Sequence, residues 1–163
     1  MTSSDNKPKN RSRKQSYATI LVLVLIIIAS FYYYDINQSK GVSAPNINVT
    51  LYAGEISATL YGFGFSSSNL TSPGPTLTLK VGDVVEMTLH NVGKMPHSFE
   101  VNTQNNTNGQ VLFNSEISPR TYIQPNQIGS VVFKVTMAGD FYYICPVPGH
   151  AELGMWGPCK ITS

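Results

Sequence analysis

Three side chains that bind soft metal ions stand at even intervals near the C-terminus. Cys145, His150 and Met155 are each five residues apart, in a segment rich in Pro and Gly, CPVPGHAELGMWGP. Five is neither the helical period nor the strand period, so burial on one face of a regular element does not explain the spacing. A thiolate, an imidazole and a thioether together favour copper, because a thioether is a poor ligand for zinc and for hard cations.

A copper site of this kind needs a second histidine, and the chain offers two more. Two histidines and one cysteine around copper, with a weak axial methionine, form the blue-copper arrangement. His97 lies just after a predicted strand and turn, in HNVGKMPHSFEV, and is the better candidate. His90 falls on the polar face of its strand with Glu86 and Thr88, which predicts a surface position. A lone histidine near a turn usually has a structural role. The assignment of His97 as a ligand therefore depends on the segment from Cys145 to Met155, which needs a second histidine to complete a copper site.

Short alternating segments from residue 46 onward predict the β-structure that must position these side chains. Leu77, Leu79 and Val81 alternate with polar residues, and the same period of two recurs further along the chain. Gly, Pro and Asn separate the segments, as expected for turns. The pattern predicts an all-β fold, an antiparallel sandwich or barrel of seven or eight strands. The expected strands are 47–52, 58–63, 77–81, 85–89, 97–101, 131–137, 141–145 and 159–162.

The N-terminal part of the chain predicts a single-pass membrane anchor. Residues 1–16 carry five basic residues and one acid, whereas residues 17–34, YATILVLVLIIIASFYYY, carry no charge. At about 1.5 Å per residue this apolar segment gives roughly 27 Å of transmembrane helix, close to the thickness of a bilayer core. The basic residues predict that the N-terminus stays in the cytoplasm. Residues 35–45 would then be a linker, and 46–163 a domain on the extracytoplasmic side of the cell membrane. A signal peptide cleaved before Pro45 is the alternative.

The second cysteine, Cys159, lies outside the ligand segment on the last predicted strand. We interpret it as a small buried hydrophobic residue. A disulfide between Cys145 and Cys159 is the main alternative, because the domain is expected to be exported and the cysteine count is even. That bond would remove the thiolate from the metal site. Three further methionines are expected to pack in the core: Met87, Met95 and Met137.

The segment from Cys145 to Gly157 resembles the ligand loop of the small blue copper proteins, the cupredoxins. It is most similar to rusticyanin and sulfocyanin, which share the Cys-x4-His-x4-Met spacing and the Pro-Gly-His and Gly-Met elements. The segment from Asn91 to Phe99 resembles the cupredoxin segment that delivers the first histidine. The resemblance covers residues 46–163 and implies a cupredoxin-like Greek-key β-sandwich.

The same resemblance implies a set of metal ligands. One type 1 copper would be bound by His97, Cys145, His150 and Met155, and no catalytic residue is implied. The resemblance also implies that His150 is partly exposed and passes the electron to a partner protein. Cys159 departs from the usual single-cysteine pattern of the family.

One-electron transfer between Cu(I) and Cu(II) is the activity that these residues favour. Four protein ligands leave no open position for a substrate, and three histidines cannot build the oxygen-reducing centre of a multicopper oxidase. We therefore expect an electron carrier rather than an enzyme, in an extracytoplasmic respiratory chain, with redox partners such as a cytochrome or a terminal oxidase. A non-redox copper-binding or storage module on the cell surface is the alternative. From residue 41 onward five basic residues face seven acids, so nucleic acid is not an expected partner.

Overall fold

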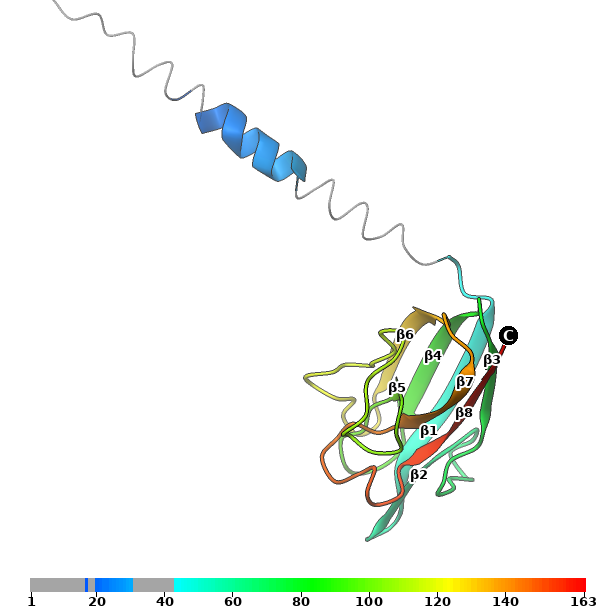
Figure 1. Ribbon diagram of the computed structural model, residues 1–163. Helices are drawn as coiled ribbons and strands as arrows, with labels where there is room; N and C mark the ends of the chain where they lie inside the picture. Colours follow the sequence, from blue (N-terminus) through cyan, green and yellow to red (C-terminus); the bar gives the residue numbers. More distant parts are fainter. Residues whose placement is uncertain (1–16, 18–19, 31–42) are drawn as a thin grey trace, which may run out of the picture. The chain divides into compact units, whose positions relative to one another are not determined.

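The computed structural model describes residue 17, residues 20–30 and residues 43–163 of the chain (Figure 1). Residues 20–30 are helical, with apolar side chains that are exposed. Among the described residues, no helix has both the length and the apolar character needed to cross a membrane. The expected cytoplasmic segment 1–16, and parts of the expected anchor and linker, lie outside the described residues.

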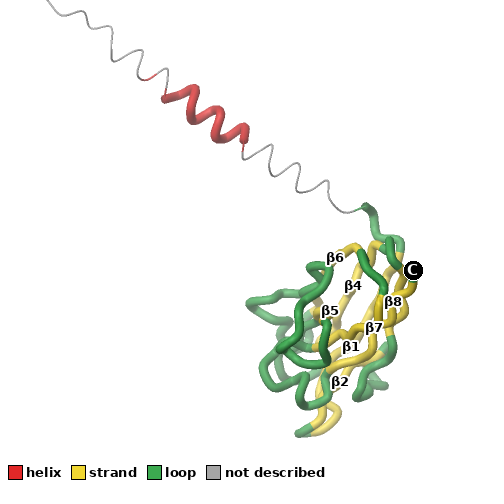
Figure 2. Tube along the Cα trace, viewed as in Figure 1, coloured by secondary structure: helices red, strands yellow, loops and turns green. Residues whose placement is uncertain are grey.

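Eight strands form the compact unit Val42–Ser163, in two four-stranded sheets. The first sheet has the order β2-β1-β4-β6 and the second β3-β8-β7-β5 (Figures 1 and 2). The strands of the first sheet are β1 (Ile47–Ser57), β2 (Leu60–Gly64), β4 (Val84–Asn91) and β6 (Ile128–Lys134). Those of the second sheet are β3 (Leu77–Lys80), β5 (Glu100–Asn102), β7 (Gly139–Ile144) and β8 (Trp156–Thr162). Each of the eight segments predicted from the sequence overlaps one of these strands, which confirms an all-β, two-sheet fold.

Strand pairing differs from the purely antiparallel prediction. β1 pairs with β4 in parallel, from Ile47 opposite Val85 to Ala53 opposite Asn91. β3 also pairs with β8 in parallel, whereas the other four strand pairs are antiparallel. The antiparallel prediction is therefore wrong for these two pairs. Period-two alternation identifies a strand with one buried face, but it does not carry the direction of the neighbouring strand.

The core lies between the sheets and follows the alternation along the strands. On β4, Met87 and Leu89 are fully buried, while Thr88 and His90 between and beside them are half-buried. Met87 therefore packs in the core as predicted. The same prediction is wrong for Met95 and Met137, which are 46% and 47% exposed. Both lie in connecting segments, where the alternation of a strand no longer directs the side chain inward.

The long connection between β5 and β6 packs against the segment that carries His97. It contains no strand of its own among residues 103–127 and is drawn as loop beside β5 and β6 in Figure 2. His97 and Ile123 exchange two backbone hydrogen bonds, at 3.0 and 2.8 Å, and the Ile117 N–H donates to Phe99 O at 3.0 Å. Because these bonds satisfy backbone groups of His97 and of Phe99 two residues later, the connection fixes the chain there.

Candidate metal centre

The antiparallel pairing of β7 and β8 explains the even spacing of the C-terminal motif. Ile144 lies opposite Trp156, and one step further the Cys145 N–H donates to Met155 O at 3.0 Å. Cys145 and Met155 therefore face each other across the start of the connection between the two strands. His150 lies midway along that connection, and its carbonyl accepts the Met155 N–H at 3.0 Å. The interval of five thus follows from a connection that folds back on itself, rather than from a helix or a strand.

Two glycines allow this connection to turn. Gly149 has φ of 84° and Gly154 has φ of 88°, in the left-handed region that side chains with a Cβ disfavour. The turns are closed by backbone hydrogen bonds from His150 N–H to Val147 O at 3.0 Å and from Leu153 N–H to Gly149 O at 3.1 Å. His150 is placed by these local bonds.

A separate segment, between β4 and β5, supplies His97. Asn91, the last residue of β4, donates from Nδ2 to Met95 O and to Ile123 O, both at 2.8 Å, and its Oδ1 accepts the Gly93 N–H at 2.9 Å. One buried side chain therefore ties the segment after β4 to the connection between β5 and β6. Because buried polar groups are costly unless they are bonded, this network favours one conformation of the segment.

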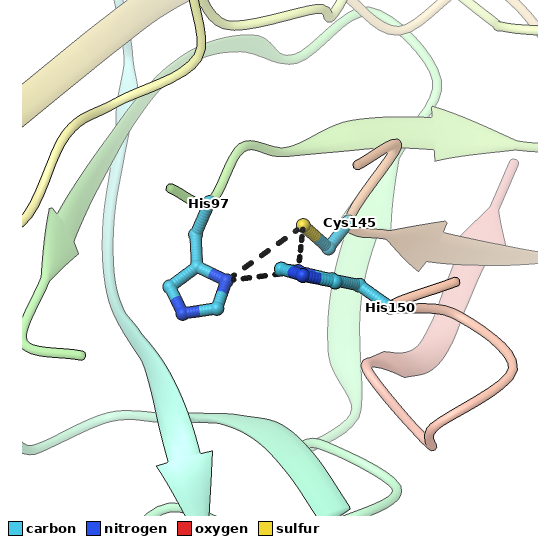
Figure 3. Close-up of side chains that lie close together, drawn as sticks. All are labelled: His97, Cys145 and His150. Atoms are coloured by element: carbon cyan, nitrogen blue, oxygen red, sulfur yellow. Dashed lines mark hydrogen bonds between the residues drawn. The ribbon is translucent and has the colours of Figure 1, made fainter. Parts of the chain in front are cut away.

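The folded chain brings together His97, Cys145 and His150, which are all buried (Figure 3). The two Nδ1 atoms of His97 and His150 are 3.2 Å apart, and Cys145 Sγ lies 3.5 Å from His150 Nδ1 and 4.0 Å from His97 Nδ1. Donor atoms that share one ion at about 2.0 Å (nitrogen) and 2.3 Å (sulfur) in tetrahedral geometry lie about 3.3 to 3.5 Å apart. The distances between the two Nδ1 atoms and between Cys145 Sγ and His150 Nδ1 match these edges, whereas the 4.0 Å between Cys145 Sγ and His97 Nδ1 is longer. The three atoms lie close enough together to share one metal ion.

The protonation of these groups also fits a metal centre. Burial, and the neighbouring His150, lower the pKa of His97 to about 4, and burial lowers the pKa of His150. Both rings are therefore neutral near pH 7, as metal ligands must be. Burial raises the pKa of the Cys145 thiol to about 12, against the hydrogen bond that its Sγ accepts from the Ser98 N–H at 3.4 Å. Metal binding there must displace that proton.

The other residues considered in the sequence differ in their burial and in their distance from the cluster. Met155 is fully buried, and its backbone is bonded to both Cys145 and His150. His90 lies outside the cluster, as predicted, but it is half-buried rather than fully at the surface, with its ring tilted against that of Tyr52 and the centroids 4.9 Å apart. His150 is only 5% exposed, because Tyr61 packs edge-on against its ring with centroids 4.6 Å apart. The expectation that His150 is partly exposed is wrong for this arrangement.

Cys159 is a free, buried cysteine, and so is Cys145. Cys159 lies opposite Phe141, four residues before Cys145 on β7. At about 3.4 Å per residue this places the two cysteines roughly 14 Å apart along the ladder, beyond the reach of a disulfide. The interpretation of Cys159 as a small buried residue is confirmed, and the alternative disulfide is wrong.

Sequence reasoning missed two residues at the centre. Tyr61, on β2, lies against both imidazoles, with ring centroids 6.0 Å from His97 and 4.6 Å from His150. Glu55, on β1, has its Oε1 3.5 Å from His97 Nε2. Burial opposes ionisation of Glu55, but the N–H groups of Lys94 and Met95 outweigh it and hold the pKa of the carboxyl below its usual value. Glu55 shares the strand parity of the buried residues Leu51 and Ala53, and that was the available signal.

Rusticyanin and a copper-resistant cuproprotein are among the curated proteins that are similar in sequence to this chain. Rusticyanin from Acidithiobacillus ferrooxidans is 34% identical over 108 residues, which cover 61% of this chain and 69% of that protein. The copper-resistant cuproprotein CopI from Rubrivivax gelatinosus is 27% identical over 89 residues, or 50% of this chain and 54% of that protein. The chain thus spans little more than half the length of CopI, and 57% of a second rusticyanin, from Acidithiobacillus ferridurans. No protein-family model matches the chain.

Solved structures share the fold at low sequence identity. Auracyanin B superposes with a TM-score of 0.52 at 18% identity, covering 74% of this chain and 92% of that one. A multi-copper oxidase from Pseudomonas thermotolerans gives a TM-score of 0.55 at 19% identity, covering 74% of this chain and 30% of the oxidase. The two-sheet fold therefore occurs both in a small protein of comparable size and as part of a much larger one.

Proposed function

Because this chain belongs to the cupredoxin family of blue copper proteins, together with rusticyanin, we propose that it is a type 1 copper protein that carries single electrons. The observation that supports this most is the meeting of His97 Nδ1, Cys145 Sγ and His150 Nδ1 within 4.8 Å of one another. Met155 would complete the ligand set from its buried position beside Cys145. Copper bound there supplies one-electron chemistry between Cu(I) and Cu(II).

The protein residues would hold the ligands in nearly one geometry through both oxidation states. Backbone hydrogen bonds join Cys145 to Met155 and His97 to Ile123, so each ligand segment is held in place by its own backbone contacts. The Ser98 N–H bond to Cys145 Sγ stabilises the thiolate form. A site that reorganises little exchanges electrons with a small activation cost, which suits a carrier.

An enzymatic role has less support than a carrier role. His97 and His150 are both in the cluster, and the third histidine of the chain, His90, lies outside it against Tyr52. The described residues therefore offer no second group of three ligands for a catalytic copper centre.

The aromatic ring of Tyr61 covers His150. A partner would therefore receive the electron through the surface formed by Tyr61 and the exposed side chains of Val92 and Met95.

The second candidate function is copper binding in metal resistance or storage. It is favoured by the similarity to CopI, whose name describes a copper-resistant cuproprotein. The visible absorption spectrum and a redox titration of the copper-loaded protein distinguish the two. A carrier shows an intense thiolate-to-copper band in the oxidised protein and cycles reversibly between two states. If the protein binds copper but has no such band, or cannot be re-oxidised without losing the metal, the storage function is the better account.

We also propose that residues 17–34 anchor the domain at the outer face of the cell membrane, where it transfers electrons in a respiratory chain. The support is the uncharged apolar sequence and the basic residues before it. Protease added to intact cells is expected to remove the copper domain. N-terminal sequencing of the protein isolated from the membrane fraction is expected to give a sequence that begins within residues 1–16. A mature soluble form that begins near Pro45 would contradict the anchor.

A further inference from the structure

A carboxylate points toward the metal centre from a strand position that should carry an apolar residue. Leu51 and Ala53 of β1 are fully buried, and Glu55 follows on the same face of the strand. Its side chain is only 20% exposed. The parallel pairing of β1 with β4 ends at Ala53, so Glu55, which is still paired with Tyr61 of β2, extends past the end of β4 and lies against the segment that follows it. An acid at such a place needs a partner to offset its desolvation.

Glu55 finds three partners in the segment that carries the first histidine. Its Oε2 accepts the Lys94 N–H at 2.9 Å, and its Oε1 accepts the Met95 N–H at 2.8 Å. The same Oε1 lies 3.5 Å from His97 Nε2. One side chain therefore holds two successive backbone groups and faces the imidazole nitrogen that is directed away from Cys145 and His150.

The other side of this contact is equally specific. His97 Nε2 is buried and has no hydrogen-bond partner in the described part of the chain, so the Glu55 carboxylate is its polar neighbour. Gly93 makes the approach possible, because a Cβ there would lie 2.5 Å from Glu55 Oε2 and 2.8 Å from His97 Nε2. The close packing of carboxylate, imidazole and glycine indicates a built arrangement rather than a chance approach of a surface acid.

We propose that Glu55 is a positioning residue that prepares His97 for the metal. The carboxylate keeps the imidazole proton on Nε2, so that Nδ1 presents its lone pair toward Cys145 Sγ and His150 Nδ1. By binding the N–H groups of Lys94 and Met95, it also fixes the segment in which His97 lies. Carboxylates that hold the remote nitrogen of a ligating histidine orient the ring and raise its donor strength. This inference rests on the proposed function only for the identity of the metal.

The first experiment uses metal-free full-length protein and does not depend on copper. Nitrogen-15 NMR of the histidine rings at pH 7 is expected to show His97 as the Nε2–H tautomer. In Glu55→Ala the tautomers of His97 should mix, and the amides of Lys94 and Met95 should exchange faster with solvent. Asp140→Asn is the matched control, since Asp140 is an exposed acid near the start of β7, outside both ligand segments. A pure Nε2–H tautomer and unchanged amides in Glu55→Ala would overturn the proposal.

The second experiment measures copper affinity and reduction potential in the same variants. Loss of a residue that orients a ligand typically weakens metal binding by about 10- to 100-fold, and we expect Glu55→Ala to fall in this range. Glu55→Gln keeps an oxygen acceptor but loses the charge, so it should retain most of the affinity and shift the equilibrium toward Cu(I). Asp140→Asn should match the wild type.

The outcomes separate the two proposals. If wild-type protein binds copper with the blue band and both Glu55 variants equal Asp140→Asn in affinity and potential, Glu55 does not position His97. If the wild type has no blue band, the proposed function fails, while the metal-free NMR result still decides the role of Glu55. If Glu55→Ala does not fold, Glu55→Gln supplies the same measurements, and a wild-type potential and tautomer in that variant would overturn the proposal.

Discussion

Two cysteines with the same burial differ completely in what surrounds their sulfur atoms. Cys145 Sγ lies among two imidazole nitrogens and one backbone N–H, whereas Cys159 is fully buried on β8. Burial raises the pKa of both thiols to about 12, so burial alone gives neither of them a role. Cys145 differs because two nitrogen donors lie beside it. A metal ion bound by the sulfur and these nitrogens can take the place of the thiol proton.

The first prediction tests this difference. Cys145→Ser should abolish the thiolate-to-copper band, because no sulfur donor remains in the cluster. Cys159→Ser should keep the band and lose stability by about 1 to 3 kcal/mol, the usual cost of a buried hydroxyl without a partner. Visible absorption and thermal unfolding measure the two effects. Equal bleaching by both substitutions would mean that Cys159 is needed at the metal centre.

The second prediction concerns Met155. A thioether is a weak donor that leaves Cu(I) relatively favoured, so an amide oxygen in Met155→Gln should lower the reduction potential. Met155→Leu removes the donor and should hold or raise the potential. A tenfold change in a one-electron equilibrium corresponds to about 59 mV, which a redox titration resolves easily. If both variants keep the wild-type potential and spectrum, Met155 is not an axial ligand.

At the level of elements, the connection between β7 and β8 is a rigid part of the centre. Its ends are joined by the Cys145–Met155 backbone bond, and its turns rely on Gly149 and Gly154. The two glycines share a positive φ but differ in surroundings. A Cβ on Gly149 would meet nothing within 4 Å, whereas a Cβ on Gly154 would collide with Ser72 Oγ. Ser72 also donates to Gly154 O at 2.8 Å.

The third prediction follows from this contrast. Gly149→Ala should cost about 1 to 2 kcal/mol of stability, the strain of a left-handed residue, and leave the visible spectrum intact. Gly154→Ala adds a collision with Ser72 to the same strain, so it should destabilise the protein more and alter the spectrum. Denaturant unfolding and absorption spectra measure both. In the double variant Ser72→Gly with Gly154→Ala, part of the extra loss should be recovered. Equal destabilisation by the two single substitutions would contradict the role of the Ser72 contact.

For the whole domain, the metal-free site is a source of acid instability. Folding holds His97 neutral with a pKa of about 4, below the value of 6.5 expected when the chain is unfolded. Above pH 6.5 both states are neutral and stability does not depend on this group. Between pH 6.5 and 4 only the unfolded state takes up the proton, so stability falls as the pH falls, and below pH 4 the loss is complete.

The fourth prediction is the size and origin of that loss. The lowered pKa of His97 should remove about 3 kcal/mol from the metal-free protein between pH 6.5 and pH 4. His97→Gln cannot take up this proton and should lose correspondingly less over the same range. Copper competes with protons for the ring, so the loaded protein should keep its stability to lower pH. Denaturant unfolding at a series of pH values provides the test, and identical pH profiles for wild type and His97→Gln would refute it.

The sequence by itself identified the candidate donor residues and the class of fold. Cys145, His150 and Met155 are close in sequence, so their spacing and chemistry can be interpreted without knowing any long-range contact. His97 could be selected by its place after a strand, and all eight strands overlap segments predicted from period-two alternation or from short β-like runs between turn residues. Each of these inferences uses information that is local to a few residues.

Only the tertiary structure decided the features that depend on pairs of distant segments. The parallel pairing of β1 with β4 carries Glu55 to His97, and the placement of β2 brings Tyr61 over His150. Alternation predicts which face of a strand is buried but not which strand lies beside it, so neither contact could be derived from the pattern. The four residues in these contacts come from four separate segments, and packing of the sheets joins them into one site.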